Sequence, residues 1–246
     1  MKPLSAMITH LYHSGFAVET INHHLILDYT EPAGINPAAS LNEGSVNHAF
    51  LSENDNIYVF ITHHHQDHFM PAVLAWQEIN PDIHIIAGYD VPLKPGDNCH
   101  LMEPYQKLKI NEVMIESYGS TDAGISFYIQ ADHLSFFHAG DLNWWHWKEF
   151  SPDEQLREER DFKREIQRLQ EKKIDIAFIP VDPRLEEAFS LAGEYVLERL
   201  KPALLIPMHF GSEFQITRMF AKEIAHASSS IAVIEKRGHQ IHFSKS

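Results

Sequence analysis

The sequence predicts an α+β protein with β-sheets inside and helices outside, and three observations support this fold class. The chain has 246 residues, of which 44% are hydrophobic, and this is enough for a sizeable core. Short β-type segments dominate its first part, whereas strand-like and helix-like segments alternate in its last part. No stretch rich in proline, glycine or serine separates the two parts. We therefore predict a single domain that spans residues 1–246.

The first part consists of short segments rich in β-branched and aromatic residues. Residues 6–13, 15–20 and 23–29 form three such segments, separated by turn-like residues. Residues 57–61, IYVFI, form a continuous apolar run that is typical of a strand buried on both faces. A helix is predicted over 71–81, with proline in its first turn. Further strands are predicted at 83–88, 107–110, 113–119, 125–130 and 134–140.

The last part begins with a highly charged segment at residues 151–173. Its apolar residues Phe162, Ile166 and Leu169 recur with helical spacing, which predicts a helix with one apolar stripe and a solvated remainder. Buried strands and amphipathic helices then alternate. We predict strands at 174–180, 203–209, 231–235 and 239–244, and helices at 185–200 and 213–227.

The composition argues against nucleic-acid and membrane partners. The chain carries 20 basic and 34 acidic residues, whereas proteins that grip nucleic acid need a basic surface. No apolar run approaches the roughly 20 residues of a membrane helix, and the first residues lack the apolar core of a signal peptide. A single cysteine, Cys99, allows no internal disulfide. We expect a cytoplasmic protein, and a homo-oligomer is compatible with the sequence.

The segment ITHHHQDHF, residues 61–69, places four histidines and an aspartate directly after the apolar run at 57–61. In an extended chain His63 and His65 share one face, and His64 points away. His63 and His65 could hold one metal ion, and Asp67 and His68 a second one nearby. Imidazole and carboxylate suit zinc, manganese or iron, and the lack of thiolates argues against a closed structural zinc site. The alternative is a polar loop in a chain with 18 histidines.

Two later segments also place a potential ligand where a predicted strand ends. Asp141 follows LSFFHAG, and His209 ends ALLIPMH. Each residue alone is weak evidence, because Gly-Asp turns and buried histidines are common. Together with residues 63–68 they repeat one pattern, a buried strand followed by a ligand, and sites of α/β folds lie in such loops.

These segments resemble the metallo-β-lactamase superfamily. THHHQDH matches its H-x-H-x-D-H signature, and HAGD and PMHFG follow in the order of its later ligand motifs. LYHSGFAVE, FFHAGDLNWW and IAFIPVD look most similar to the branch that contains L-ascorbate-6-phosphate lactonase and related metal-dependent hydrolases. The resemblance covers nearly the whole chain and implies a four-layer αββα sandwich with the site along one edge.

The resemblance also implies ligands for two divalent metal ions, zinc first, with manganese or iron as alternatives. The implied ligands are His63 and His65 for the first ion, Asp67, His68 and His209 for the second, and Asp141 as a bridge. The sequence lacks the third histidine that usually binds the first ion, and Asp122 in YGSTDAG is the predicted substitute. A water ligand or a site with one metal ion are the alternatives. An additional oxygen ligand would favour manganese or iron relative to zinc.

The implied function is hydrolysis by a metal-bound hydroxide. Asp67 is a catalytic candidate as well as a metal ligand, because its carboxylate could orient this hydroxide. The predicted substrate is a small molecule with an ester, lactone or phosphodiester bond. The alternatives are a nuclease or cyclic-nucleotide phosphodiesterase, and a non-catalytic metal-binding protein with the same fold. Residues predicted to support the site are His13 as a catalytic or substrate-binding group, Trp144 and Trp145 as a pocket wall, and Arg184 as an anion-binding group.

Overall fold

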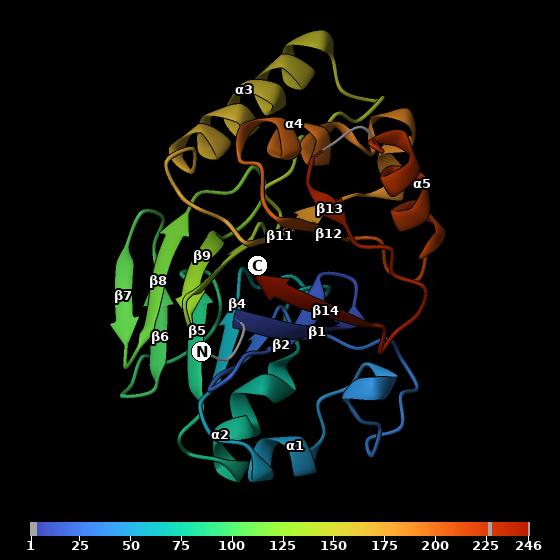
Figure 1. Ribbon diagram of the computed structural model, residues 1–246. Coiled ribbons are helices and arrows are strands. Elements are labelled where there is room, and N and C mark those ends of the chain that lie inside the picture. Colours follow the sequence, from blue (N-terminus) through green and yellow to red (C-terminus); the bar gives the residue numbers. More distant parts are fainter. Residues whose placement is uncertain (1–3, 226–227, 246) are drawn as a thin grey trace.

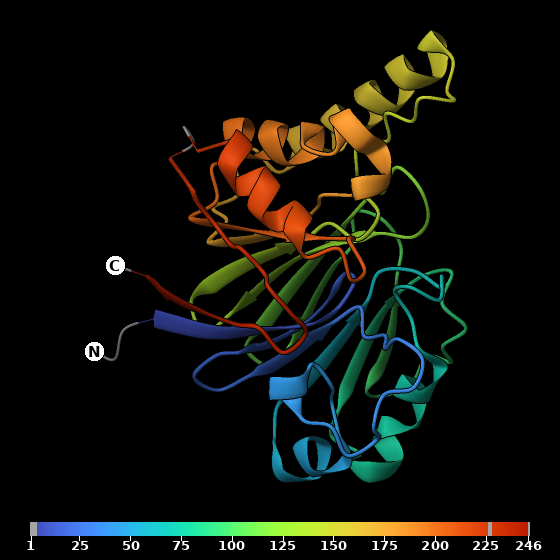
Figure 2. The ribbon, with the colours of Figure 1, turned by 90° about the vertical axis from the view of Figure 1, so that its right-hand side faces the viewer.

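The computed structural model describes residues 4–225 and 228–245 and shows two sheets packed face to face between two layers of helices (Figure 1). Helices α3 (Pro152–Arg168), α4 (Leu191–Arg199) and α5 (Gln215–Glu223) cover one sheet. The shorter helices α1 (His48–Glu53) and α2 (Trp76–Ile79) cover the other sheet. The view at a right angle shows the same four layers (Figure 2). The predicted αββα sandwich is therefore confirmed.

The first sheet has seven strands. In spatial order they are β14 (Gln240–Lys245), β1 (Leu4–Tyr12), β2 (Gly15–Glu19), β3 (His24–Leu27), β4 (Ile57–Ile61), β5 (His84–Gly88) and β6 (Cys99–Met102). Strands β14 to β3 pair antiparallel, and strands β3 to β6 pair parallel. Because β3 and β4 run parallel, the residues that follow these two strands lie at the same edge of the sheet.

The second sheet also has seven strands and the same division into antiparallel and parallel parts. In spatial order they are β7 (Lys107–Ile110), β8 (Val113–Tyr118), β9 (Ser126–Ala131), β10 (Leu134–His138), β11 (Ile176–Pro180), β12 (Leu204–Met208) and β13 (Ser230–Ile231). Strands β7 to β10 pair antiparallel, and β10 to β13 pair parallel. The carboxyl ends of β10, β11 and β12 therefore share one edge.

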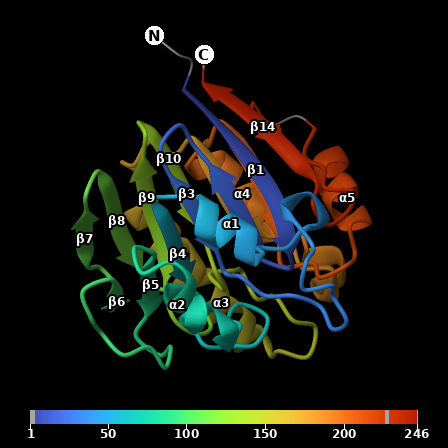
Figure 3. The same ribbon diagram turned by 90° about the horizontal axis from the view of Figure 1, so that it is seen from below.

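Strand β4 shows how the apolar pattern determines the layers. Tyr58 and Phe60 point into the core between the two sheets, whereas Ile57, Val59 and Ile61 belong to the core beneath α1 and α2. All five side chains are buried, as predicted for an apolar run with alternating faces. Seen from below, α1 and α2 lie across this sheet (Figure 3).

Some predicted elements are wrong in length or type. Residues 71–81 form a short 3₁₀ helix, Pro71–Ala75, followed by the single turn of α2. The helix predicted over 185–200 is broken, because Glu186 has a φ of 52° that no right-handed helix accommodates. A 3₁₀ segment, Pro183–Ala188, therefore precedes α4.

The ends of the chain's last helices and strands also differ from the predictions. Helix α3 ends at Arg168 and not at residue 173. Helix α5 ends at Glu223, and residues 226–227 of the predicted helix lie outside the described part of the chain. Only Ser230–Ile231 of the region around 231–235 pairs as a strand, although Ala232 and Ile234 are buried. Helix α1 and strand β6 were not predicted.

The charged helix α3 packs through its apolar stripe as predicted, but one of its charged residues, Glu165, is also buried. Phe162 and Ile166 of α3 are fully buried. Glu165 is buried as well, and it accepts hydrogen bonds from the Tyr105 hydroxyl at 2.9 Å and the Gly119 N–H at 3.2 Å. This carboxylate fastens α3 to the loop after β8. Within the described residues, no helix is both long and apolar enough to cross a membrane.

Asp132, between β9 and β10, connects the two sheets at the edge where β4 begins, opposite the carboxyl ends of the parallel strands. Its carboxylate accepts hydrogen bonds from the Thr20 hydroxyl at 2.7 Å and the Asn22 N–H at 2.8 Å, and lies 2.9 Å from His23 Nδ1. Burial alone would raise the pKa of Asp132, but these hydrogen bonds outweigh burial and lower the pKa to about 2. The ionised carboxylate therefore stabilises the fold.

We expect Asp132→Asn to lower the free energy of unfolding at pH 7 by about 1–2 kcal/mol, since solvent near the surface screens part of the interaction. Asparagine tolerates the φ of 48° at this position, so the backbone should not be strained. The lowered pKa makes this stability present above pH 3.8 and lost as the pH falls towards 2. Urea unfolding at pH 7 and pH 3 measures the difference. This account would be contradicted if wild type and Asp132→Asn differed by the same free energy of unfolding at both pH values. It would also be contradicted if the exposed Asp97→Asn lost as much stability as Asp132→Asn.

Candidate metal centre

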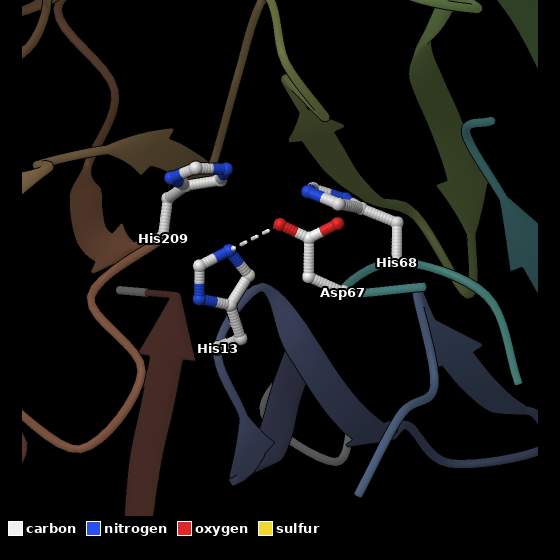
Figure 4. Close-up of side chains that lie close together, drawn as sticks. All are labelled: His13, Asp67, His68 and His209. Carbon is white, nitrogen blue, oxygen red and sulfur yellow. Dashed lines mark ion pairs between the residues drawn. The ribbon is translucent and has the colours of Figure 1, made fainter. Parts of the chain in front are cut away.

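Potential metal ligands from four strand ends meet at the edge where the parallel strands of both sheets finish. They form two groups, in each of which one ligand atom per residue lies within 4.8 Å of the others. The groups are His63, His65 and Asp141, and His13, Asp67, His68 and His209. Figure 4 shows that the second group brings together the loops after β1, β4 and β12. The structure thus assembles the predicted ligands of residues 63–68 with Asp141 and His209.

Asp141 belongs to the first group and also contacts two histidines of the second. Its Oδ2 is 3.3 Å from His63 Nε2, while its Oδ1 is 3.0 Å from His68 Nε2 and 3.1 Å from His209 Nε2. Three of these atoms are buried and form no hydrogen bond with the described part of the chain: His68 Nε2, His209 Nε2 and Asp141 Oδ1. Atoms that bind one ion at about 2.1 Å lie roughly 3.0–3.4 Å apart, which agrees with these distances. These orphaned atoms fit divalent metal ions.

The histidines of this centre are oriented by partners behind them. His68 Nδ1 lies 2.7 Å from Asp28 Oδ2, so it donates its proton to the carboxylate and leaves Nε2 bare. The Thr62 hydroxyl donates to Asp28 Oδ2 at 2.7 Å and can therefore accept from His63 Nδ1 at 3.0 Å. The Thr62 N–H donates to Asp28 Oδ1 at 2.7 Å. Asp28 thus fixes the ring orientation of His68 directly and of His63 through Thr62.

His209 has its own carboxylate partner. Its Nδ1 lies 3.0 Å from Asp182 Oδ2, and Asp182 also accepts from Arg184 Nε at 3.0 Å and Arg184 Nη2 at 2.5 Å. Burial raises the pKa of Asp182, but its bonds to His209 and Arg184 outweigh burial and lower the pKa to about 2. The ionised Asp182 keeps the proton of His209 on Nδ1 and leaves Nε2 free for a ligand bond.

The charges of the centre suit a bound cation. Burial lowers the pKa of His68, but the carboxylates of Asp141 and Asp28 outweigh it and raise the pKa to about 10. Burial likewise raises the pKa of Asp141, but the imidazoles around it hold that pKa well below its usual range. The carboxylates therefore favour positive charge among buried imidazoles, and a divalent ion supplies it.

Local backbone geometry brings these loops close together. His13, Asp28 and His209 have φ values of 53°, 39° and 67°, in the left-handed region that residues other than glycine rarely adopt. Gly124 has a φ of 66°, and any Cβ there would clash with the carbonyl of Thr62. The Ile125 N–H donates to the same carbonyl at 3.1 Å, which joins the loop after β8 to the loop after β4.

The structure places His64 and Asp122 outside both ligand groups. His64 is exposed and its Nδ1 lies 2.8 Å from Asp90, so it points away from His63 and His65 as predicted. Asp122 is exposed and lines the cavity beside the centre. Burial raises the pKa of the nearby Glu158, and the charges of Asp161 and Asp122 raise it further. The role of Asp122 as a metal ligand stays a prediction.

Asp122→Ala tests this role. If Asp122 replaces the missing histidine, we expect bound metal to fall from about two to about one equivalent per chain, because the first ion keeps only His63, His65 and Asp141. Plasma mass spectrometry of wild type and variant measures the metal content. Glu158→Gln, on the wall of the same cavity, is the matched control and should leave the metal content unchanged. An unchanged content in Asp122→Ala would restrict Asp122 to the cavity wall.

A cavity of about 450 Å³ opens beside the two ligand groups. His65, Asp67, Asp141 and His209 reach it from the centre. Trp145, Trp147 and Phe150 form its aromatic side, and the rings of Trp145 and Trp147 stack with centroids 5.6 Å apart. Arg184 also lines it, with its guanidinium 5.5 Å from the ring centre of Trp147. Trp145 and Arg184 thus both line this cavity, and their predicted roles at the substrate stay predictions.

Trp144 does not reach this cavity. Its indole packs beside Phe162 and Tyr195, with Lys163 Nζ 4.3 Å from the ring centre, and it lines a separate cavity. Trp145 lines the cavity beside the ligand groups, so these two neighbouring tryptophans face different cavities. The structure therefore supports Trp145 alone as part of the predicted pocket wall.

Asp28 and Thr62 were not predicted from the sequence, and no role was predicted for Asp182. Asp28 follows the buried strand β3 just as Asp141 follows β10, so the same pattern could have identified it. Trp147, Phe150 and Glu158 were also missed. Their positions depend on the path of a loop and on helix α3.

Solved structures share this arrangement of sheets and helices. Igni18, a metallo hydrolase from Ignicoccus hospitalis, matches with a TM-score of 0.64 at 16% sequence identity, over 98% of this chain and 100% of that chain. YhfI, a metallo-β-lactamase fold protein from Bacillus subtilis, matches with a TM-score of 0.59 at 14% identity, over 98% of this chain and 100% of that chain. The chain has the metallo-β-lactamase fold.

The metallo-β-lactamase fold also occurs in an enzyme of another class. CmlA, a diiron β-hydroxylase from Streptomyces venezuelae, matches with a TM-score of 0.62 at 10% identity, over 98% of this chain and 55% of that chain. No protein-family model matches the chain. At these identities the likeness concerns the fold, and the chemistry must be inferred from the residues of this chain. The resemblance to the ascorbate-6-phosphate lactonase branch stays a prediction.

Proposed function

We propose that the protein is a dinuclear metal-dependent hydrolase that cleaves an ester, lactone or phosphodiester bond in a small molecule. The observation that carries the proposal is the position of Asp141 between two ligand groups, with bare imidazole nitrogens 3.0–3.3 Å from its oxygens. Asp28 and Asp182 hold His68 and His209 in the form that binds a metal ion. Zinc, manganese and iron all suit these ligands.

Each side chain at the cavity has a role that its position supports. The two ligand groups would hold the divalent ions, which would lower the pKa of a water ligand towards about 7 and polarise the bond under attack. Asp67, whose side chain is 48% exposed, reaches the cavity and can orient the attacking water through its carboxylate. Arg184 can bind an anionic group of the substrate. Trp145 excludes water from one side.

The cavity supports a small substrate in preference to a polymer. Its volume of about 450 Å³ lies in the range of small-molecule sites, and its aromatic side suits an apolar or planar group. Among the described residues, Arg184 is the single lysine or arginine that lines it, whereas four carboxylates do so. A nucleic-acid backbone would meet this negative charge, so the nuclease alternative is less favoured.

The proposal is tested with the purified protein, stripped by a chelator and reloaded separately with zinc, manganese and iron. The probes are 4-nitrophenyl acetate, δ-valerolactone, bis(4-nitrophenyl) phosphate and a cyclic nucleotide. We expect about two metal equivalents per chain and metal-dependent hydrolysis of an ester, lactone or phosphodiester probe. Cleavage of the cyclic nucleotide alone would support the phosphodiesterase alternative.

Other outcomes would contradict the proposal. Metal binding without hydrolysis of any probe would favour a non-catalytic metal-binding protein. Oxygen consumption by the iron-loaded protein without hydrolysis would favour oxidative chemistry, as in the diiron enzyme CmlA with the same fold. His209→Ala serves as the inactive reference, because it removes a predicted ligand of the second ion.

A further inference from the structure

His13 belongs geometrically to the second ligand group, but its hydrogen bonds differ from those of the other histidines. The Gly211 N–H donates to His13 Nδ1 at 3.1 Å, and the His209 N–H donates to the His13 carbonyl at 3.2 Å. In contrast, Nδ1 of His68 and Nδ1 of His209 each face a carboxylate. His13 Nδ1 therefore accepts a hydrogen bond, whereas Nδ1 of His68 and Nδ1 of His209 donate one.

This contact determines where the proton of His13 lies. A ring nitrogen that accepts a hydrogen bond from a backbone N–H carries no proton, so the proton of His13 resides on Nε2. A metal ion needs a bare nitrogen, and histidine ligands donate from the other ring nitrogen. His13 Nε2 thus offers an N–H group and not a lone pair, even though it lies within the ligand group.

The N–H of His13 faces Asp67. His13 Nε2 lies 3.5 Å from Asp67 Oδ2, is buried, and forms no hydrogen bond among the described residues. Figure 4 shows one carboxylate oxygen of Asp67 towards His13 and the other towards His68. The His13 ring packs 4.1 Å from the ring of His209. His138 Nε2 donates to the Ser14 carbonyl at 2.9 Å and holds the adjacent turn in place.

We propose that His13 is a positioning residue that donates its Nε2–H to Asp67 and is not a metal ligand. The hydrogen bond would engage one oxygen of Asp67, so that the other oxygen remains for the second metal ion. Asp67 needs this restraint because its side chain is 48% exposed and could otherwise turn into solvent or chelate through both oxygens. The inference rests on the metal centre of the proposed function but does not require turnover.

Two substitutions separate a donor from a ligand. His13→Asn keeps an acceptor for the Gly211 N–H and tolerates the φ of 53°, but it loses the donor that faces Asp67. His13→Gln places an amide N–H near the position of Nε2. His133→Asn is the matched control, because His133 is exposed, has a φ of 62° and lies outside the centre.

Metal affinity is measured by competition with a chromophoric chelator, together with metal content and thermal unfolding. We expect His13→Asn to bind the more weakly held ion about 10–100-fold less tightly at unchanged stability, and His13→Gln to restore most of the affinity. The control should equal wild type. Unchanged affinity in His13→Asn, or equal losses in both variants, would overturn the donor role. A loss of one whole equivalent in both variants, as in His209→Ala, would identify His13 as a ligand.

The affinity measurement keeps this inference distinct from the proposed function. A protein that binds two ions but hydrolyses no probe would contradict the proposed function, while the variants would still decide the role of His13. A protein that binds no divalent ion after reloading would overturn both.

Discussion

Replacing Asp141 with asparagine is expected to remove metal from both ligand groups and to produce the largest loss of activity of any substitution considered. Asp141 has close polar contacts with the imidazoles of both groups, through Oδ2 to His63 and through Oδ1 to His68 and His209. An amide has one acceptor oxygen, so its NH₂ group would face at least one bare imidazole nitrogen. The substitution also removes the negative charge that would lie between the two cations.

Metal content and turnover of the responsive probe measure the effect. We expect less than one metal equivalent per chain and a loss of turnover of more than about 100-fold. Removing an outer hydrogen-bond partner of a ligand lowers activity by at most about 100-fold, and losing a ligand itself should lower it further. Asp97→Asn, an exposed aspartate far from the centre in sequence, is the control and should behave as wild type. Two retained equivalents in Asp141→Asn would show that the groups bind metal independently, and would contradict a bridging carboxylate.

The ligands of residues 63–68 could be predicted because their geometry is local. Alternation along an extended chain places His63 and His65 on one face, and the structure finds their facing nitrogens 3.1 Å apart. The burial of both faces of β4 could also be predicted from the sequence, because a strand that is apolar at every position is buried on both faces. The fold class and the convergence of Asp141 and His209 on this loop followed from the resemblance and from the strand-end pattern.

Other features depend on contacts that no local pattern encodes. Asp28 reaches Thr62 and His68 only because β3 pairs in parallel with β4, which lies 30 residues further along the chain. The path of one loop decides that Trp145 and not Trp144 faces the cavity. The break at Glu186 interrupts a segment whose helix propensity continues through it, so tertiary contacts overrode local preference there.

Asp28→Asn is expected to weaken metal binding although Asp28 belongs to neither ligand group. The carboxylate accepts three hydrogen bonds, from the Thr62 N–H, the Thr62 hydroxyl and His68 Nδ1, each at 2.7 Å. Asparagine has one acceptor oxygen, so a buried donor would be left facing an NH₂ group. We expect metal affinity to fall about 10–100-fold and the free energy of unfolding of the metal-free protein to fall by about 2–3 kcal/mol.

Asp182→Asn provides the comparison that separates orientation from general destabilisation. Asp182 orients only His209, whereas Asp28 orients His68 directly and His63 through Thr62. Asp182→Asn should therefore weaken only the second ion, while Asp28→Asn should weaken both. Chelator competition and urea unfolding of the two variants measure these effects. The contrary outcome is that Asp28→Asn and Asp182→Asn lose the same stability while Asp28→Asn keeps full metal affinity. His63 and His68 would then hold their orientation without the Asp28 carboxylate, and the bound ions would align the rings.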